Sequence, residues 1–359
     1  NISLDVIGKR KDNYHEIETI MQQIDLKDIL TIRDRKNEIK IECNNSLVPL
    51  DSSNIVHKAF RVLSEKCHVK RGAHIIIEKN IPVAAGLAGG SANAAATLKG
   101  LNKLWNLNLT EAELMDIGVH IGADVPFCIM GGTALAKGIG EKLEKLDSFK
   151  DHMLLLANPG IEVTSSHVYS LLDIEKIIKK PNTDMLLKAI HEDDLYTVSK
   201  NMVNVLEQVT CSEYKEIEKI KEDMLSCGAL GSLMSGSGPT VFGFFDDEDK
   251  LYNCKRILEK RIEKVFIART IWIKFPLLVE HIIMDLLKGV GILFFEIKEA
   301  LKHIFDIYLL LAIAFICLCI FLVDIPRLKK DNCHREANMA KGIGIFYIVA
   351  SPILYFLFR

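Results

Sequence analysis

The sequence predicts an α+β fold followed by a helical apolar tail, and three observations lead to this prediction. Short β-type runs at residues 29–32 and 38–42, the second with period-2 alternation, predict two strands that pair as a hairpin. Apolar residues at helical spacing between residues 54 and 67 predict a helix. After Thr270 the composition becomes mainly apolar, which separates a tail, residues 271–359, from the rest of the chain.

The remaining elements follow from the same patterns in chain order. Further strands are predicted at residues 1–7, 74–78, 153–157 and 265–268, and one more begins at Thr133. Further helices are predicted at residues 92–105, 166–172, 183–191, 195–206, 211–226 and 249–263. Thr110 and Glu113 form a capping-box pattern, which predicts another helix beginning near residue 111.

Length and composition limit the class of protein. With 359 residues the chain is longer than a usual domain, so we expect domains at 1–150, 151–270 and 271–359. The formal net charge of −2 gives no electrostatic argument for a nucleic-acid partner. The nine cysteines show neither paired CxxC spacing nor a zinc pattern, as expected for a reduced, cytoplasmic protein, and the sequence indicates no metal ligands.

The stretch at residues 82–96 joins a predicted strand to a predicted helix, and we call residues 82–90 the first glycine loop. Gly86, Gly89 and Gly90 lack a Cβ atom, so the backbone can approach a ligand closely there. Ser91 is the predicted N-cap of the helix, whose amino end would face a phosphate group. An ordinary glycine-rich turn is the alternative interpretation. The spacing matches neither the Walker A motif nor the dinucleotide-binding fingerprint.

This stretch resembles the phosphate loop of the GHMP kinases, the superfamily of galactokinase, homoserine kinase and mevalonate kinase. Its form Gly-Leu-Ala-Gly-Gly-Ser-Ala-Asn is most similar to the branch that acts on a cytidine diphosphate-linked methylerythritol in isoprenoid synthesis. The resemblance implies a two-domain GHMP kinase fold, with an N-terminal domain like ribosomal protein S5 domain 2 and a ferredoxin-like C-terminal domain. It also implies a cytoplasmic enzyme that uses ATP to phosphorylate the 2-hydroxyl group of that small-molecule substrate.

The resemblance further implies which residues bind the cofactors. The expected ATP-binding residues are Pro82, Ala84, Gly86, Leu87, Ala88, Gly89, Gly90, Ser91, Ala92 and Asn93. Mg²⁺ is expected as the second cofactor, because the phosphate charge must be neutralised and Mg²⁺ binds largely through nucleotide oxygens and water.

The turn that ends in Tyr14 and His15 is the second segment that resembles the family. There the equivalent pair binds cytosine, since an aromatic face can stack on a base and an imidazole nitrogen can hydrogen-bond to its edge. The family usually has Gly where this chain has Asn13, but Asn tolerates the left-handed conformation. A solvated turn without a ligand is the alternative interpretation.

Asp124 is the predicted catalytic base. It lies in Gly-Ala-Asp-Val-Pro, residues 122–126, which matches the family motif whose Asp activates the substrate hydroxyl group. Phosphoryl transfer requires that hydroxyl group to lose its proton as it attacks. A lone Asp before Val-Pro would more often cap a turn or a helix, and only the other motifs favour the catalytic interpretation.

Two segments of the second half also resemble the family. Residues 235–242, Ser-Gly-Ser-Gly-Pro-Thr-Val-Phe, are similar to its third motif, although Pro239 stands where Ala is usual. We call residues 235–238 the second glycine loop. Thr164 matches a position that faces the substrate in the family. The expected substrate-binding residues are Asn1, Tyr14, His15, Thr164, Ser235, Gly236, Ser237 and Gly238.

The family's catalytic Lys precedes the Asn of a Lys-Ile-Asn-Leu stretch by two residues. This sequence begins at that Asn, in Asn1-Ile-Ser-Leu, and Lys9 is in the wrong register to replace the Lys. We therefore expect the Lys to lie upstream of Asn1. Two alternatives stay open: another GHMP kinase, and a catalytically impaired, membrane-tethered relative without the Lys.

The tail contains two apolar runs that are candidate membrane segments, residues 307–323 and 342–358. The first has 17 residues without a formal charge, the lower limit for a span. Basic residues between the runs would place that linker on the cytoplasmic side. Residues 276–297 also contain charges, which favours an interfacial helix. Membrane association through the tail is thus one expectation, and a fused, unrelated segment is the other.

Overall fold

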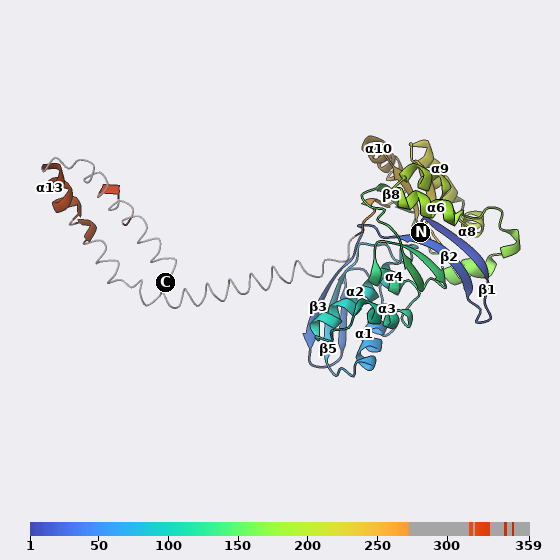
Figure 1. The fold of residues 1–359 in the computed structure, drawn as a ribbon, viewed down its shortest axis with the longest axis horizontal. Helices are drawn as coiled ribbons and strands as arrows, with labels where there is room; N and C mark the ends of the chain where they lie inside the picture. The colour runs from blue at the N-terminus through green and yellow to red at the C-terminus, as the bar shows by residue number, and fades with distance from the viewer. Residues whose placement is uncertain (273–315, 319, 331–340, 343–346, 348–359) are drawn as a thin grey trace. The chain divides into compact units, whose positions relative to one another are not determined.

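The computed structural model describes residues 1–272, 316–318, 320–330, 341–342 and 347. The chain divides into two compact units, Asn1–Phe275 and Pro276–Arg359. The described elements of the first unit are drawn from blue to orange in Figure 1. All elements that position the candidate site belong to this unit.

Strands and helices alternate along the first unit, as the sequence patterns predict. The strands are β1 (Ser3–Lys9), β2 (His15–Gln22), β3 (Ile29–Arg35), β4 (Ile39–Cys43), β5 (Gly72–Glu78), β6 (Thr133–Gly138), β7 (Lys142–Lys145), β8 (Met153–Asn158), β9 (Val203–Asn204), β10 (Gly231–Met234), β11 (Val241–Phe245) and β12 (Lys264–Arg269). The helices are α1 (Ile55–Lys66), α2 (Gly89–Leu104), α3 (Glu111–Val119), α4 (Val125–Met130), α5 (Ser165–Leu171), η1 (Ile174–Lys176), α6 (Thr183–His191), α7 (Leu195–Asn201), α8 (Glu207–Glu213), α9 (Lys215–Ser226) and α10 (Glu248–Leu258).

The hairpin predicted from residues 29–42 is wrong, although both strands exist. In the three-stranded sheet β5 lies between β3 and β4, antiparallel to β3 and parallel to β4. Alternate side chains of β5, among them Ile75 and Ile77, are buried under α1 and α2 together with Leu63 and Leu98. The most apolar strand therefore takes the centre of the sheet, where both of its edges are paired.

Two further sheets form the rest of the unit. The five-stranded sheet has the order β7-β6-β2-β1-β9, and the four-stranded sheet has the order β10-β11-β8-β12. Strand β9 pairs with β1 in parallel although about 200 residues separate them in the chain. Helices α8, α9 and α10 pack with β8 and β1 around a shared apolar core that includes Leu4, Val6 and Leu155 (Figure 1). The two halves of the unit are thus joined through β1.

Helix ends show where local sequence decides the structure and where it does not. The capping box of α3 is present as predicted, since Thr110 Oγ1 accepts from the Glu113 backbone N–H and the Glu113 carboxylate accepts from the Thr110 backbone N–H. Helix α2, however, begins before Ser91. Its N-cap is Ala88, in the left-handed conformation at φ 51° and without a side-chain cap. The predicted Ser91 cap is therefore wrong.

In the second half, most predicted helices are found with shifted ends. The helix predicted at residues 195–206 ends at Asn201, and strand β9 follows it. The predicted helix at residues 211–226 is divided at Tyr214 into α8 and α9.

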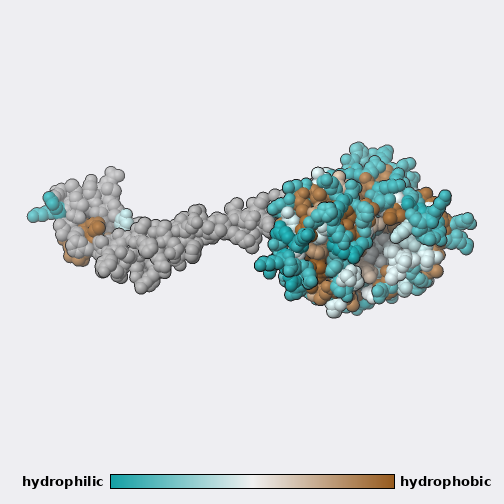
Figure 2. All heavy atoms as spheres, turned by 90° about the horizontal axis from the view of Figure 1, so that it is seen from below, coloured by the Kyte–Doolittle hydropathy of each residue, from teal (hydrophilic) through white to brown (hydrophobic). Residues whose placement is uncertain are grey.

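The surface of the first unit seen in Figure 2 is mainly hydrophilic, with hydrophobic side chains in scattered patches. In the second unit, the described elements are a π-helical turn (Ile320–Asp324) and α13 (Ile325–Lys330). Among the helices that the structure describes, none has both the length and the apolar character needed to cross a membrane. The two candidate membrane segments lie mostly outside the described residues.

Candidate functional site

One cleft of the first unit collects most of the predicted site residues. It has a volume of about 1540 Å³ and is lined by residues from β1, β2, the first glycine loop, α5 and the second glycine loop. The predicted residues that line it are Asn1, Tyr14, His15, Pro82, Ala84, Gly86, Leu87, Ala88, Gly89, Gly90, Asn93, Asp124, Ser235, Gly236 and Ser237. Segments more than 200 residues apart in the chain thus meet at one place.

Four predicted residues do not line this cleft. Ser91 and Ala92 lie in the first turn of α2, and Gly238 is the last residue of the second glycine loop, where its backbone faces Gly86. Thr164 is exposed at the N-cap position of α5, while the next residue, Ser165, lines the cleft. The roles of these four residues stay predictions.

The first glycine loop has a backbone suited to close contact with a ligand. Ala84, Gly86 and Ala88 all have positive φ values, 52°, 69° and 51°. The loop leads directly into α2, whose first turn receives no hydrogen bond from a capping side chain. Backbone N–H groups at such a helix end, together with the helix dipole, favour a bound phosphate.

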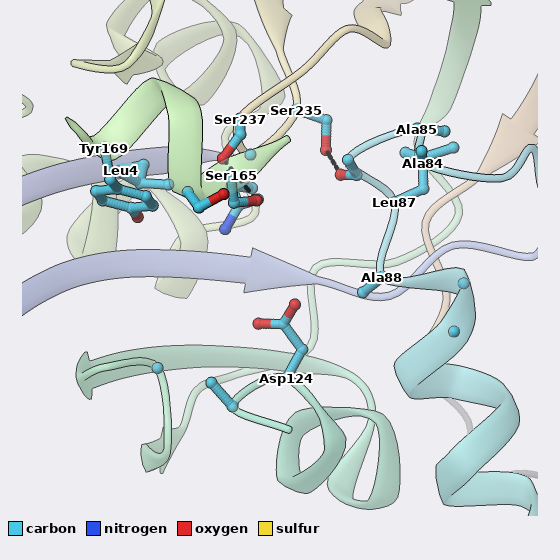
Figure 3. Close-up of a pocket in the computed structure, with 18 of the residues that line it drawn as sticks. Leu4, Ala84, Ala85, Leu87, Ala88, Asp124, Ser165, Tyr169, Ser235 and Ser237 are labelled. Atoms are coloured by element: carbon cyan, nitrogen blue, oxygen red, sulfur yellow. Dashed lines mark hydrogen bonds between the residues drawn. The ribbon is translucent and has the colours of Figure 1, made fainter. Parts of the chain in front are cut away.

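The second glycine loop lies against the first. Ser235 Oγ donates a hydrogen bond of 2.8 Å to the Gly86 carbonyl oxygen, which Figure 3 shows as a dashed line. A Cβ atom at Gly86 would lie 2.4 Å from the Ser235 carbonyl oxygen and 2.7 Å from that of Gly238. Glycine is therefore required at position 86 by both the positive φ and the contact between the loops.

Asp124 occupies the N-cap position of α4, yet its side chain does not cap the helix. The carboxylate points into the cleft, where Ser165, Ser237 and Tyr169 approach from the opposite wall (Figure 3). Burial raises the pKa of this carboxyl group above its ordinary value. Such a group is a stronger proton acceptor than an exposed aspartate, which is the property that a general base requires.

His15 stacks on Tyr169, a residue that the sequence did not single out. The ring centroids are 5.2 Å apart and the planes are inclined by 25°. Burial, and after it the charge of Lys9, lower the pKa of His15, so the imidazole is neutral at neutral pH and can both donate and accept. The adjacent Tyr14 is 60% exposed. Asn13 has a φ of 68°, the left-handed conformation expected where the family has Gly.

Tyr169 comes from α5, together with Ser165, whose Oγ is 3.0 Å from Ser237 Oγ. Burial raises the pKa of the Tyr169 phenol, which keeps it protonated. A pattern search could have found Tyr169 only as an aromatic residue near Thr164, because its contact with His15 spans more than 150 residues. The wall of the cleft that carries His15 and Tyr169 is therefore assembled from both halves of the unit.

A buried ion pair lies behind the first glycine loop. Lys79 Nζ is 2.7 Å from Asp28 Oδ2, and the two side chains are 5% and 1% exposed. Asp28 Oδ1 accepts from the backbone N–H groups of Asn80 and Ile81 at 2.7 and 2.8 Å. These bonds fix the chain immediately before Pro82, where the loop begins.

Asn1 lies at the start of β1 beside the second glycine loop. Its Nδ2 donates to Thr19 Oγ1 at 2.8 Å, and its Oδ1 is 3.4 Å from the position of a Cβ atom at Gly236. In the part of the chain that the structure describes, no three His, Cys, Asp or Glu side chains gather as metal ligands.

Comparison with known proteins agrees with this arrangement. The family model of the GHMP kinases N terminal domain matches residues 54–132, and that of the GHMP kinases C terminal matches residues 186–264. A further family model matches residues 305–359. The first two matches contain the first glycine loop, Asp124 and the second glycine loop.

Two curated relatives are similar to this chain over most of its length. The 4-diphosphocytidyl-2-C-methyl-D-erythritol kinases of Clostridium novyi and of Clostridium botulinum (strain Alaska E43) are 52% and 51% identical over 271 residues. The match covers 76% of this chain and 97% of each relative.

Solved structures show the same fold. A crystal structure of 4-(cytidine 5'-diphospho)-2C-methyl-D-erythritol kinase has a TM-score of 0.66 and 27% identity, covering 75% of this chain and 96% of that one. Homoserine kinase from Cytophaga hutchinsonii, at 18% identity and a TM-score of 0.60, shares the fold, with 70% of this chain and 88% of that one covered. The two-domain GHMP kinase fold is thus confirmed, and the chain belongs to the GHMP kinase family, in its group of 4-diphosphocytidyl-2-C-methyl-D-erythritol kinases.

Proposed function

We propose that this chain is an ATP-dependent kinase that phosphorylates the 2-hydroxyl group of 4-diphosphocytidyl-2-C-methyl-D-erythritol, a step of isoprenoid precursor synthesis. One observation carries the proposal: the half-buried Asp124 carboxylate faces the same cleft as the first glycine loop and the His15–Tyr169 pair. The cleft therefore offers a phosphate cradle, a proton acceptor and an aromatic surface for a base. Relatives with half of their residues identical carry the name of this enzyme.

Each part has a chemical role in the proposed reaction. The amide groups at the start of α2 bind the phosphates of ATP, and the neutral His15 with Tyr169 binds the cytosine by hydrogen bonding and stacking. Asp124 accepts the proton of the attacking hydroxyl group as the new O–P bond forms. Ser235 and Ser237 lie where their hydroxyl groups can contact phosphate or substrate.

Mg²⁺ fits this site as an ion carried by the nucleotide. Of the acidic residues that line the cleft, Asp124 is the one beside the first glycine loop, and the described residues hold no preformed ligand cluster. The ion would supply neutralisation of the phosphate charge, held mainly by phosphate oxygens and water.

The proposal is tested by measuring phosphoryl transfer from ATP, using the full chain together with any residues that precede Asn1 in its gene. We expect turnover of the cytidyl substrate and none of mevalonate, homoserine or galactose. Asp124→Asn should lower kcat by about 100- to 10,000-fold, the usual contribution of a general base, while the affinity for ATP stays unchanged.

Two results would contradict the proposal. Turnover of mevalonate-type substrates without turnover of the cytidyl compound would assign the chain to another activity of the family. Near-normal turnover by Asp124→Asn would exclude this carboxylate as the base, whatever the substrate.

A further inference from the structure

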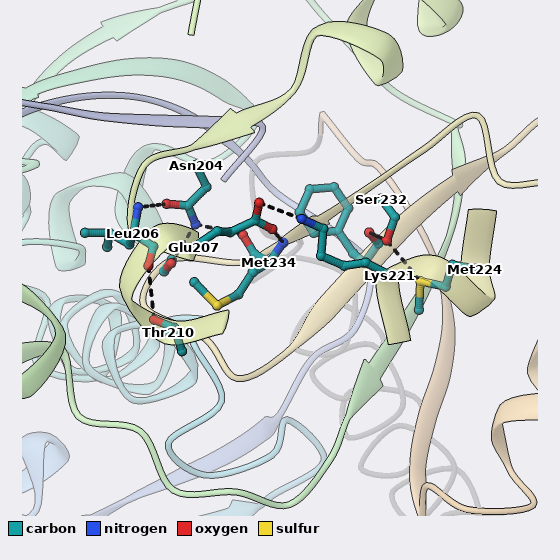
Figure 4. Close-up of polar contacts among 10 residues, drawn as sticks. Asn204, Leu206, Glu207, Thr210, Lys221, Met224, Ser232 and Met234 are labelled. Carbon is teal, nitrogen blue, oxygen red and sulfur yellow. Dashed lines mark hydrogen bonds and ion pairs between the residues drawn. The ribbon is translucent and has the colours of Figure 1, made fainter. Parts of the chain in front are cut away.

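The second glycine loop is attached to the body of the protein by side chains of residues 204–210, at the junction of β9 and α8. This segment lies outside the cleft-lining residues. Strand β10, which leads into the loop, is an edge strand of its sheet, so the backbone groups of Met234 that face away from β11 have no neighbouring strand in the four-stranded sheet. Side chains take the place of that strand (Figure 4).

Asn204 binds the loop on its carbonyl side. Its side-chain amide is 97% buried, and Nδ2 donates to the carbonyl oxygens of Met234 at 2.9 Å and Gly236 at 2.7 Å. Its Oδ1 accepts from the Leu206 backbone N–H at 3.0 Å. Both amide hydrogens and the acceptor are therefore used, and the amide can have only one orientation.

Glu207 binds the same strand on its amide side. Oε1 accepts from the Met234 backbone N–H at 2.8 Å, and Oε2 is 2.6 Å from Lys221 Nζ on α9. The carboxylate is 17% exposed and the ammonium group 23% exposed, so the pair lies mostly away from water. Lys221 thus holds the carboxylate in the orientation that receives the Met234 N–H (Figure 4).

These contacts connect the loop to the rest of the cleft. Asn204 is paired with Leu4 of β1, and Asn1, two residues before β1, lies beside Gly236. The loop in turn touches the first glycine loop through Ser235 and Gly86. A shift of the Met234–Gly236 backbone would therefore move the Ser235 carbonyl oxygen and the Ser235 Oγ that contact Gly86.

We propose that Asn204 and Glu207 are positioning residues that hold the second glycine loop at the distance from the first at which phosphoryl transfer occurs. The proposal rests on the proposed kinase function and assigns it two residues that touch neither ATP nor substrate. Their loss lowers kcat, because the loops no longer keep the phosphates and Asp124 in the reactive arrangement. Their loss leaves cytidine recognition intact, because the side-chain hydrogen bonds of Asn204 and Glu207 go to Met234, Gly236, Leu206 and Lys221, and none goes to the helix of Tyr169 or the strand of His15.

The test compares Asn204→Asp, Glu207→Ala and Glu207→Gln with the unchanged chain, each with any residues preceding Asn1 in its gene. The aspartate keeps the size of the side chain but places oxygen against two carbonyl oxygens. The glutamine keeps an acceptor for the Met234 N–H and loses only the charge. We measure kcat with ATP and the cytidyl substrate, the Kd of cytidine diphosphate by calorimetry, and the melting temperature.

We expect kcat to fall at least tenfold in Asn204→Asp and Glu207→Ala, with the Kd of cytidine diphosphate unchanged within twofold. The kcat of Glu207→Gln should be at least fivefold higher than that of Glu207→Ala. Asn182→Ala is the matched control, because it removes the side-chain cap of α6 in the same half of the unit, at a residue that does not line the cleft. It should lower the melting temperature and leave kcat within twofold.

Three results would overturn the proposal: kcat within twofold of the unchanged chain in Asn204→Asp, equal kcat values in Glu207→Gln and Glu207→Ala, or a tenfold loss of kcat in Asn182→Ala. If the unchanged chain bound cytidine diphosphate but transferred no phosphate from ATP, that result would instead contradict the proposed function. The calorimetric and kinetic measurements therefore separate the two failures.

Discussion

Asp124 places a half-buried carboxylate in the wall of the cleft, and its partial burial affects folding as well as catalysis. Its pKa in the folded chain is raised by burial above the ordinary value of 3.8, so the folded state binds a proton more tightly than the unfolded state does. The charged form is correspondingly disfavoured by folding. The stability of the chain must therefore fall as the pH rises from about the ordinary pKa through the raised one.

Asp124→Asn removes this cost, and we expect it to raise the melting temperature at pH 7 while it abolishes most turnover. The difference from the unchanged chain should shrink as the pH falls through the raised pKa of the folded state toward the ordinary pKa of 3.8, because the carboxyl group is then protonated in the folded state and increasingly protonated in the unfolded state. Thermal unfolding of both proteins between pH 4 and pH 8 checks this. A melting temperature that falls in the variant at pH 7 would show that the carboxylate stabilises the fold.

The stacked His15–Tyr169 pair leads to a prediction about specificity. Tyr169→Ala removes one aromatic face from the cleft, and stacking on a base contributes about 1–3 kcal/mol, so the KM for the cytidyl substrate should rise about tenfold or more. The KM for ATP should stay within twofold. Tyr196→Ala, at an exposed tyrosine of α7 that does not line the cleft, is the control. An equal rise of both KM values would contradict a role confined to the base.

Among single residues, the sequence identified the side chains that lie inside recognisable motifs. It missed the side chains outside these motifs that contact them in the folded chain. Asp124, His15 and Ser235 were found because short motifs contain them. Tyr169 and Asn204 lie in segments without such a motif, and their contacts to His15 and Gly236 span 154 and 32 positions. Only the folded chain brings these partners together.

The two glycine loops act as one element, and Gly86 is the point of contact. Gly86→Ala combines a left-handed φ of 69° with a Cβ atom 2.4 Å from the Ser235 carbonyl oxygen. We expect the free energy of unfolding to fall by more than ~1 kcal/mol and the affinity for ATP to drop, because the loops must separate. Urea unfolding and ATP binding measure the two effects.

Gly90→Ala is the matched comparison for folding stability. Gly90 lies in the first turn of α2, and a Cβ atom there would have its nearest neighbour, Ile55 Cγ2, at 3.6 Å. Alanine in a helix is favoured over glycine by ~1 kcal/mol, so this variant should be as stable as the unchanged chain or more stable. If both variants lost the same stability, the contact between the loops would not be the cause.

The positions of the strands and helices were predicted better than the pairing of the strands and the caps of the helices. The strand patterns at residues 29–32 and 38–42 are correct, but β5 lies between the two strands, because this central position pairs both edges of the most apolar strand. Ser91 has the side chain of an N-cap, yet α2 begins at Gly89, and its N-cap is the left-handed Ala88, three residues before Ser91. In both cases packing and backbone conformation outweighed a correct local preference.

Across the whole chain, the change in composition after Thr270 predicted the boundary between the kinase part and the tail. No tertiary contact could be predicted as clearly from the sequence. The structure separates the units at residue 275, five residues beyond the predicted change in composition. The internal boundary proposed near residue 150 stays a prediction. Strand β9 pairs with β1, so the halves on either side of that boundary share a sheet.

The tail should be dispensable for the reaction. Every residue that lines the cleft belongs to Asn1–Phe275, and the curated relatives match 271 residues of this chain over 97% of their own length. A chain that ends at Phe275 should therefore keep kcat and both KM values within twofold. A chain that ends at Glu263 is the control: it loses β12, which pairs with β8 along its whole length, and should fail to fold. If the chain ending at Phe275 kept its melting temperature but lost tenfold in kcat, the tail would have to contribute to the reaction itself, because the fold that carries the cleft would still be complete.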